Sequence, residues 1–249
     1  MKRLLALCCG ALARSLYAVA AESSNTVSIQ LLRQGLHDRP TNLRSILQSD
    51  IDAVGSNDYD AILLAYGICG TATVGLRARQ TPLVIPRAHD CITLYLGSMD
   101  RYSYEFTRHP GTYWYSVDYL ERLDDGASDQ LGAAGISELV DQHEKYVRKY
   151  GRKRADFLIE EFKRWARHYT RAVFIDTGHG DQAGYEIQAR KRAQQEGWLF
   201  ERVQGDKRLL EMLVNGIWSE DEFLIVPPGH SIQQSYDTGL IRAVPDHTH

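Results

Sequence analysis

Three cysteine residues stand within five residues after apolar segments that have the composition of buried strands. They are Cys9, Cys69 and Cys91, of four cysteines in the chain. The apolar segments that precede them are 4–7, 61–68 and 82–86. In an open parallel sheet, ligands bind beyond the carboxyl ends of the strands. We therefore expect the three thiols to converge on one pocket, where thiols beside a histidine favour a soft metal or a reactive thiolate.

His89 and Cys91 form the sharpest pair of candidate ligands. If the strand continues through Cys91, the two side chains lie on one face and can bind the same metal. If a helix begins after Asp90, Asp90 caps it and Cys91 lies at its N-terminus, where the pKa of a thiol falls. Both geometries favour a thiolate, and we expect Asp90 to orient His89 as a hydrogen-bond acceptor. Cys8 alternates with Cys9 and is expected to face the opposite side and pack.

The expected metal ligands are therefore Cys9, Cys69, Cys91 and His89, and the identity of the metal is open. Three thiolates and an imidazole suit zinc, whereas three cysteines with an open fourth position suit a [4Fe–4S] cluster. A metal-free reactive thiolate is a third alternative, and simple packing of buried cysteines is the structural one.

Two further residues near this cluster have candidate roles. His37 follows the second expected strand and is either a reserve ligand or proton donor, or a surface histidine beside Asp38. Arg87 directly follows the strand at 82–86, and we expect it to bind an anionic group of a ligand or cofactor.

The elements that must position these residues alternate between strand and helix, which predicts an α/β fold. The expected strands are 4–7, 27–32, 61–66, 82–86, 172–175, 198–203 and 223–226, and the expected helices are 43–54, 185–195 and 209–214. We expect two Rossmann-like lobes with parallel sheets that face a cleft. Residues 1–125 form the N-terminal lobe with the Cys/His cluster, and residues 126–249 form a helical linker and the second lobe.

The middle of the chain has a different composition. The segment 98–119 is rich in tyrosine and is expected to be an aromatic loop, which either lines a ligand pocket or plugs one end of the sheet. The segment 124–135 is acidic and rich in glycine and alanine, as in a linker, and two amphipathic helices follow it. The second of these helices has an expected buried stripe of Phe157, Leu158, Phe162, Trp165 and Tyr169.

A second candidate site follows the strand at 172–175. Asp176, Gly178 and Gly180 lie between that strand and a helix, where glycines let the backbone approach a ligand and a helix N-terminus favours anions. This turn is similar to the first loop of S-adenosylmethionine-dependent methyltransferases, and it predicts a nucleotide-type cofactor site. The alternative is a polar, glycine-rich turn without a ligand.

Composition and charge exclude several classes of protein. The 249 residues have a formal net charge of -3, so no whole-chain basic field attracts nucleic acid. No apolar segment reaches the roughly 20 residues that span a bilayer, and four cysteines are too few for a secreted disulfide scaffold. Residues 1–20 imitate a signal peptide, but Arg14 interrupts the apolar run. We expect this segment to begin with a core strand of a cytoplasmic protein that binds neither nucleic acid nor membranes.

The sequence also resembles a family. The residues that carry the likeness are 66–70, 74–76, 82–92, 96–98, 101–102 and 110–113, with a weaker likeness at Cys9-Gly10 and across most of the chain. They resemble the domain of unknown function numbered 1638. One departure is Thr71-Ala72-Thr73, where the family often has asparagine and glycine. The resemblance implies a soluble α/β protein whose genes often lie near corrinoid-dependent methyltransferases of methylamine metabolism.

These observations lead to three hypotheses of function, and they leave open whether the protein is an enzyme. The first is a thiolate-ligated metal-binding protein with an accessory or methyl-transfer role in corrinoid-linked methylamine or one-carbon metabolism. Its expected partners are a small-molecule ligand and a corrinoid protein or methyltransferase, with the corrinoid as a partner ligand. The second is a non-catalytic small-molecule binding or sensor module. The third is an S-adenosylmethionine-dependent methyltransferase.

Overall fold

The largest sheet has five strands in the order β2-β1-β3-β4-β8 and is mixed. It appears in a computed structural model that describes residues 1–122, 143–157, 168–235 and 239–246. The strands are β1 (Arg3–Cys9), β2 (Thr26–Leu32), β3 (Ala61–Ala65), β4 (Leu83–Pro86) and β8 (Phe223–Val226). The first four run parallel, and β8 pairs antiparallel with β4. Within β1, the segment 4–9 is buried, as its apolar composition predicts.

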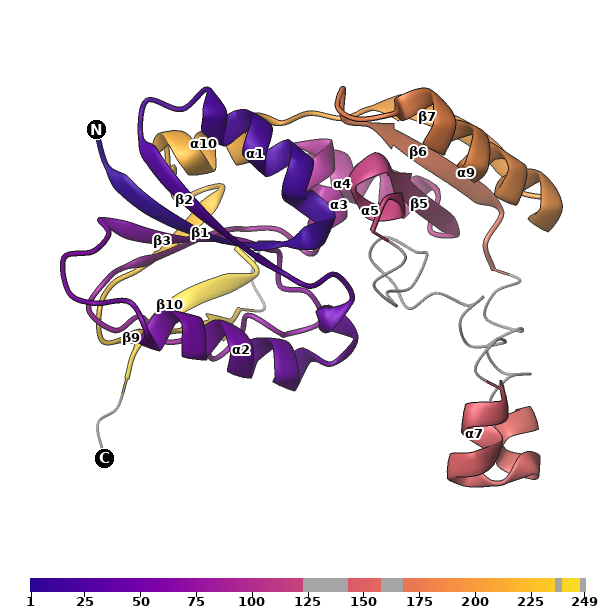
Figure 1. Ribbon diagram of the computed structural model, residues 1–249, viewed down its shortest axis with the longest axis horizontal. Helices are drawn as coiled ribbons and strands as arrows, with labels where there is room; N and C mark the ends of the chain where they lie inside the picture. The colour runs from indigo at the N-terminus through magenta and orange to yellow at the C-terminus, as the bar shows by residue number, and fades with distance from the viewer. Residues whose placement is uncertain (123–142, 158–167, 236–238, 247–249) are drawn as a thin grey trace.

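Helices cover both faces of this first sheet. Figure 1 shows α1 (Ala13–Ala21) and α10 (Arg208–Asn215) on one face and α2 (Pro40–Asp52) on the other. The apolar residues Leu43, Leu47 and Ile51 recur along α2 at helical spacing and are buried, which fixes the face that α2 turns to the sheet. Short 3-10 turns, η1 (Gly10–Leu12) and η2 (Leu36–Asp38), follow β1 and β2 at the carboxyl edge.

The second sheet has the order β5-β6-β7, with all strands parallel. Its strands are β5 (Thr112–Ser116), β6 (Arg171–Asp176) and β7 (Leu199–Gln204), and its helices are α5 (Val117–Leu120) and α9 (Gln182–Glu196). Phe174 and Ala189 pack in a core of its own, whereas Trp114, Val173 and Ile175 join the core of the first sheet. An antiparallel pair, β9 (His230–Gln234) and β10 (Ile241–Pro245), ends the described chain.

The expected α/β fold is confirmed, but the two sheets exchange elements along the sequence. β5 precedes residue 125 and belongs to the second sheet, whereas β8 and α10 follow residue 125 and complete the first. The sheets therefore do not divide at residue 125. The cleft between two lobes stays a prediction.

The expected aromatic loop at 98–119 is wrong, because this segment forms regular elements. Residues Met99–Arg108 form α4, which follows the short helix α3 (Cys91–Leu96), and β5 and α5 come next. The Ser98 side chain caps α4 by accepting hydrogen bonds from the backbone of Asp100 and Arg101. Tyr102 and Phe106 are one turn apart on α4, and their rings stack with centroids 5.9 Å apart.

Other expectations in the middle of the chain meet the structure only in part. Phe157 was expected to be buried, but it is 64% exposed. Leu158, Phe162, Trp165 and the linker at 124–135 lie outside the described residues. α7 (His143–Tyr150) precedes Phe157. None of the helices in the described parts of the chain is long and apolar enough to cross a membrane.

Candidate functional site

A cavity of about 370 Å³ lies at the carboxyl edge of the first sheet. It is lined by all the residues of the expected Cys/His cluster: Cys9, Cys69, Cys91, His89 and the reserve His37. Leu12, Leu36 and Leu43 add apolar surface. The three cysteines expected to converge therefore line one cavity at the first sheet, and Tyr119 of α5 adds a residue from beside the second sheet.

The loops after β3 and β4 are locked together, which brings Cys69 beside His89 and Cys91. The backbone N–H of Ile68 donates to the carbonyl of Ala88 at 2.8 Å, and that of Cys69 donates to the carbonyl of His89 at 3.0 Å. Gly67 permits this close approach. A Cβ atom at Gly67 would lie 2.6 Å from the backbone nitrogen of Asp90, so a side chain there forces the loops apart.

The backbone at Cys69 is in a left-handed conformation that a residue with a side chain rarely adopts. Its φ is 47°, and Gly70 and Thr71 follow with φ of 62° and 78°. For non-glycine residues this conformation costs about 1–2 kcal/mol. Such strain is typical of functional sites, where the surrounding structure holds it. Here the paired loops hold it and direct the Cys69 side chain to the cavity.

Of the two alternatives for His89 and Cys91, the helical one is confirmed. Asp90 is the N-cap of α3, and its carboxylate accepts from the backbone of Ile92 at 2.9 Å and of Thr93 at 3.4 Å. Cys91 is the first residue of α3, and its side chain is buried against the cavity. The second Asp90 oxygen accepts from the Tyr102 hydroxyl at 3.4 Å.

The expected depression of thiol pKa by the helix N-terminus is wrong for this cavity. Burial raises the pKa of Cys9 to about 11. Burial also raises the pKa of Cys69 and of Cys91, and the charge of Asp90 raises both further. A charge on Cys9 would raise the pKa of both thiols further. Without a bound metal, the thiols are protonated at neutral pH.

His89 and Asp90 differ from the expected pair. The ring centroids of His89 and Tyr102 are 5.4 Å apart. Within the described residues, Asp90 accepts hydrogen bonds from Ile92, Thr93 and Tyr102 and none from His89. Desolvation lowers the pKa of His89 and favours the neutral imidazole, which is the metal-binding form. Burial raises the pKa of Asp90 to about 6, against hydrogen bonds that lower it.

The donor set of the cavity fits a soft metal in chemistry but not yet in geometry. Thiolates and an imidazole are the ligands that zinc and iron–sulfur clusters take. Within the described residues, however, no three His, Cys, Asp or Glu side chains are already grouped to hold a metal ion. The four cysteines are free thiols. Metal binding would therefore require the side chains to turn toward one centre.

Three other expectations near the cluster have different outcomes. His37 lines the cavity with its Nε2 atom 3.4 Å from an Asp38 oxygen. Cys8 is fully buried outside the cavity lining, as its alternation with Cys9 predicts. Arg87 is not one of the residues that line the cavity. Its guanidinium donates to the carbonyls of Glu220, Gly239 and Ile241 and so fastens the chain around β8 and β10 to the first sheet.

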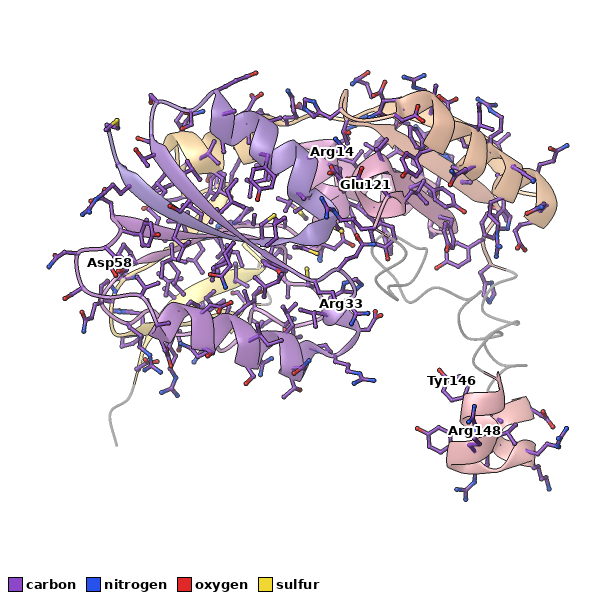
Figure 2. The ribbon with its side chains drawn as sticks, viewed as in Figure 1. Arg14, Arg33, Asp58, Glu121, Tyr146 and Arg148 are labelled. Atoms are coloured by element: carbon purple, nitrogen blue, oxygen red, sulfur yellow. The ribbon has the colours of Figure 1, made fainter. Side chains whose placement is uncertain are left out.

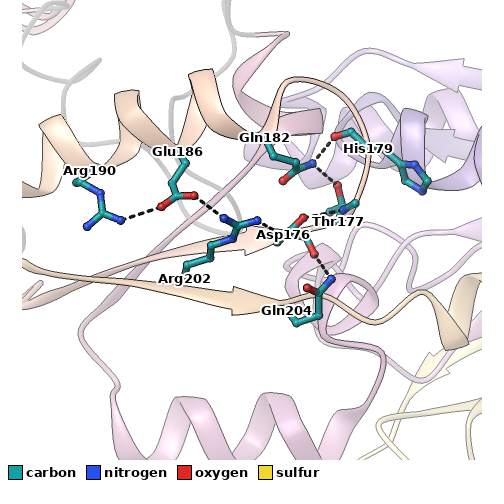
Figure 3. Close-up of polar contacts among 9 residues, drawn as sticks. Asp176, Thr177, His179, Gln182, Glu186, Arg190, Arg202 and Gln204 are labelled. Carbon is teal, nitrogen blue, oxygen red and sulfur yellow. Dashed lines mark hydrogen bonds and ion pairs between the residues drawn. The ribbon is translucent and has the colours of Figure 1, made fainter.

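The turn at Asp176–Gly180 is occupied by contacts within the protein. The Asp176 carboxylate accepts from the backbone of Gly178 at 2.8 Å and is paired with Arg202, as Figure 3 shows. Burial raises the pKa of Asp176, but these hydrogen bonds outweigh it and leave the pKa below its ordinary value. Gly180 lines a separate open hollow beside Arg14. Asp176, Gly178 and Gly180 thus lie in one turn, but the Asp176 carboxylate already contacts Gly178 and Arg202 instead of a cofactor.

Several residues of the cavity carried no signal of a chemical role in the sequence, although Tyr66 and Tyr102 lie within the segments that carry the family resemblance. Tyr66 is the residue after β3, and in the sequence it lies within an apolar segment without a polar neighbour to indicate a site. Tyr102 belongs to α4, which was taken for a loop, and Tyr119 comes from α5. Arg33 follows β2 and is labelled in Figure 2. Its position at a strand end is the one signal that could have indicated it.

Comparison with known proteins gives a family but no characterised relative. No curated protein and no solved structure is significantly similar to this chain. Residues 31–214 match the family described as "Protein of unknown function (DUF1638)", as the resemblance in the sequence predicted. The match includes Cys69, His89 and Cys91 and ends within α10, while β1 with Cys9 lies before it. The chain belongs to this family of proteins of unknown function.

Proposed function

We propose that this chain is a metal-binding protein whose cavity holds a soft metal, zinc or an iron–sulfur cluster, through the thiolates of Cys9, Cys69 and Cys91. The observation that carries this proposal is the meeting of three cysteines from separate strand ends in one cavity beside His89. Cysteines that only pack as small apolar residues do not need neighbouring sulfurs or a histidine at the same opening.

The raised thiol pKa values are compatible with this proposal. A metal ion competes with protons for sulfur, and a coordinated thiol is deprotonated outright. The neutral His89 imidazole supplies a fourth ligand or a proton acceptor. Because the three cysteines line one cavity but are not grouped around one centre among the described residues, metal binding includes a rotation of side chains within a cavity that has room for it.

The biological role that we propose is accessory to, or catalytic in, methyl transfer in corrinoid-linked methylamine or one-carbon metabolism. This part of the proposal is supported by the family resemblance and by chemistry, since thiolate-bound metals and corrinoids both take part in methyl transfer. A corrinoid protein or a methyltransferase is the proposed partner.

The test is metal analysis of protein that is purified anaerobically. The proposal predicts stoichiometric zinc, or iron with sulfide and the visible absorption of sulfur-to-iron charge transfer. Cys69→Ser and Cys91→Ser should each lose most of the metal. Cys8→Ala is the matched control, because Cys8 lies next to Cys9 but outside the cavity lining. Wild-type protein without stoichiometric metal, or equal metal in Cys8→Ala and Cys69→Ser, would overturn the proposal.

A non-catalytic small-molecule binding module is the second candidate, and the size of the cavity favours it. A volume of about 370 Å³ falls in the range of roughly 300–1,000 Å³ of small-molecule sites. Thermal-shift screening discriminates the two candidates. Stabilisation by a small molecule that survives both Cys69→Ser and Cys91→Ser would favour the binding module.

A further inference from the structure

The cavity is larger than a metal site requires. One water occupies about 30 Å³ in the liquid, and the cavity measures about 370 Å³. A metal held at the sulfurs of Cys9, Cys69 and Cys91 therefore leaves room for an organic molecule. The lining of the remaining space decides which class of molecule fits.

Tyr66 brings a buried hydroxyl group without a partner to this cavity. The residue is 3% exposed, and its Oη atom makes no hydrogen bond. Burial raises the pKa of Tyr66, and the neighbouring Cys9, Cys8 and Cys69 raise it further, so the hydroxyl stays protonated near the sulfurs. Buried polar atoms without a partner are rare in native proteins and require an explanation. A ligand atom that accepts a hydrogen bond from Tyr66 supplies one.

Arg33 and His37 line the same cavity. Arg33 is exposed, and its guanidinium has no hydrogen-bond or ion-pair partner among the described residues. The Nε2 atom of His37 is buried and makes no hydrogen bond, although it lies 3.4 Å from an oxygen of Asp38. An arginine that is free at the mouth of a pocket is suited to a carboxylate, which it can bind with two parallel hydrogen bonds.

The acidic residues of the lining do not reverse this preference. Asp90 already accepts from Ile92, Thr93 and Tyr102, and Asp38 lies beside His37. Among the described residues of the lining, the Arg33 guanidinium and the Tyr66 hydroxyl have no hydrogen-bond partner, and both can donate.

We propose that the cavity binds a small organic acid, whose carboxylate is held by Arg33 and whose apolar part lies against Leu12, Leu36 and Leu43. Tyr66 donates a further hydrogen bond to the same carboxylate, which is the only acceptor that a simple organic acid offers. The site goes beyond the proposed metal function and does not depend on it, because none of these five side chains is a proposed metal ligand.

The experiment is a calorimetric titration of metal-free protein with acetate, propionate and butyrate, followed by butyramide and inorganic phosphate. Affinity should increase about fourfold with each added methylene, because burying one contributes about 0.8 kcal/mol. Butyramide keeps the shape of butyrate without its charge, and phosphate keeps a charge without the apolar part. Both should bind at least about tenfold more weakly than butyrate.

Variants then test the two donors. Arg33→Gln should weaken butyrate binding at least about tenfold, and Tyr66→Phe should weaken it about two- to tenfold. Arg148→Gln is the control for lost charge, since Arg148 is exposed on α7 and does not line the cavity (Figure 2). Equal affinity for all three acids, binding of phosphate as tight as butyrate, or no effect of Arg33→Gln would each overturn the proposal. Repeating the titration with zinc-loaded protein separates this result from a failure of metal binding.

Discussion

Replacing Asp90 by asparagine should stabilise the metal-free protein at neutral and alkaline pH. Asp90 lies at the cavity among protonated thiols, and its carboxyl group has a pKa raised from 3.8 to about 6, mainly by burial. Asparagine is as good an N-cap as aspartate, so α3 keeps its capping hydrogen bonds. The substitution thus removes the charge of a half-buried carboxylate and changes the contact with the Tyr102 hydroxyl.

The magnitude follows from the difference in proton affinity. A rise of the pKa from 3.8 to about 6 corresponds to about 3 kcal/mol at about 1.36 kcal/mol per unit. Because Asp90 is partly exposed, solvent screening reduces the expected gain to about 1–2 kcal/mol. The folded state binds this proton more tightly than the unfolded state, so wild-type stability falls as pH rises from 3.8 to about 6. The advantage of Asp90→Asn is therefore small at about pH 4 and complete above about pH 7.

Urea unfolding of wild type and variant at about pH 4 and about pH 8 measures this difference. Asp221→Asn is the control, because Asp221 is exposed in the turn before β8 and the same substitution there should change stability by less than about 0.5 kcal/mol. A gain of equal size at both pH values, or a loss at about pH 8, would refute the assignment of a raised pKa to Asp90.

Three further predictions concern the loops and the proposed metal. Zinc affinity should rise steeply between pH 6 and pH 8, with a slope of about three in a plot of log affinity against pH. The reason is that each of the three thiols must lose a proton to bind zinc, and burial raises the pKa of each. A competition assay with a chelator measures this affinity, and a pH-independent value would exclude thiolate ligation. Gly67→Ala should destabilise the protein by about 2 kcal/mol or more in thermal unfolding, since its Cβ atom meets backbone atoms of Asp90 and Ala88. Arg87→Met should leave metal and ligand binding unchanged and make the chain after β8 more sensitive to limited proteolysis, because it loses hydrogen bonds to three backbone carbonyls.

Local pattern was sufficient to predict the carboxyl edge of the first sheet. The buried segments that end near Cys9, Cys69 and Cys91 are strands or strand ends, because continuous apolar runs bounded by glycine or charged residues have few alternatives in an α/β chain. A helix capped by Asp90 was one of two alternatives that the sequence left open, and the structure confirms it. Parallel pairing then brings the strand ends together.

The pairing of strands that lie far apart in the sequence could not be predicted from local pattern. The tyrosine-rich segment 112–116 is a strand because it pairs with β6, and the residue pattern of the segment does not indicate this pairing partner. α4 was missed because Tyr102, Tyr104 and Phe106 suggested a loop, while the Ser98 cap that starts the helix was overlooked. The protonation of the thiols depends on burial, which composition does not give.

The place of β8 has a consequence for synthesis on the ribosome. β8 covers the edge of β4, yet it begins only at Phe223, after the whole second sheet has been translated. At about 5–20 residues per second, the interval is on the order of ten seconds. During that time the nascent chain exposes an apolar edge strand, Leu83–Pro86, with unpaired backbone groups. Chaperones that bind such strands should therefore associate with this protein before its C-terminal segment leaves the ribosome.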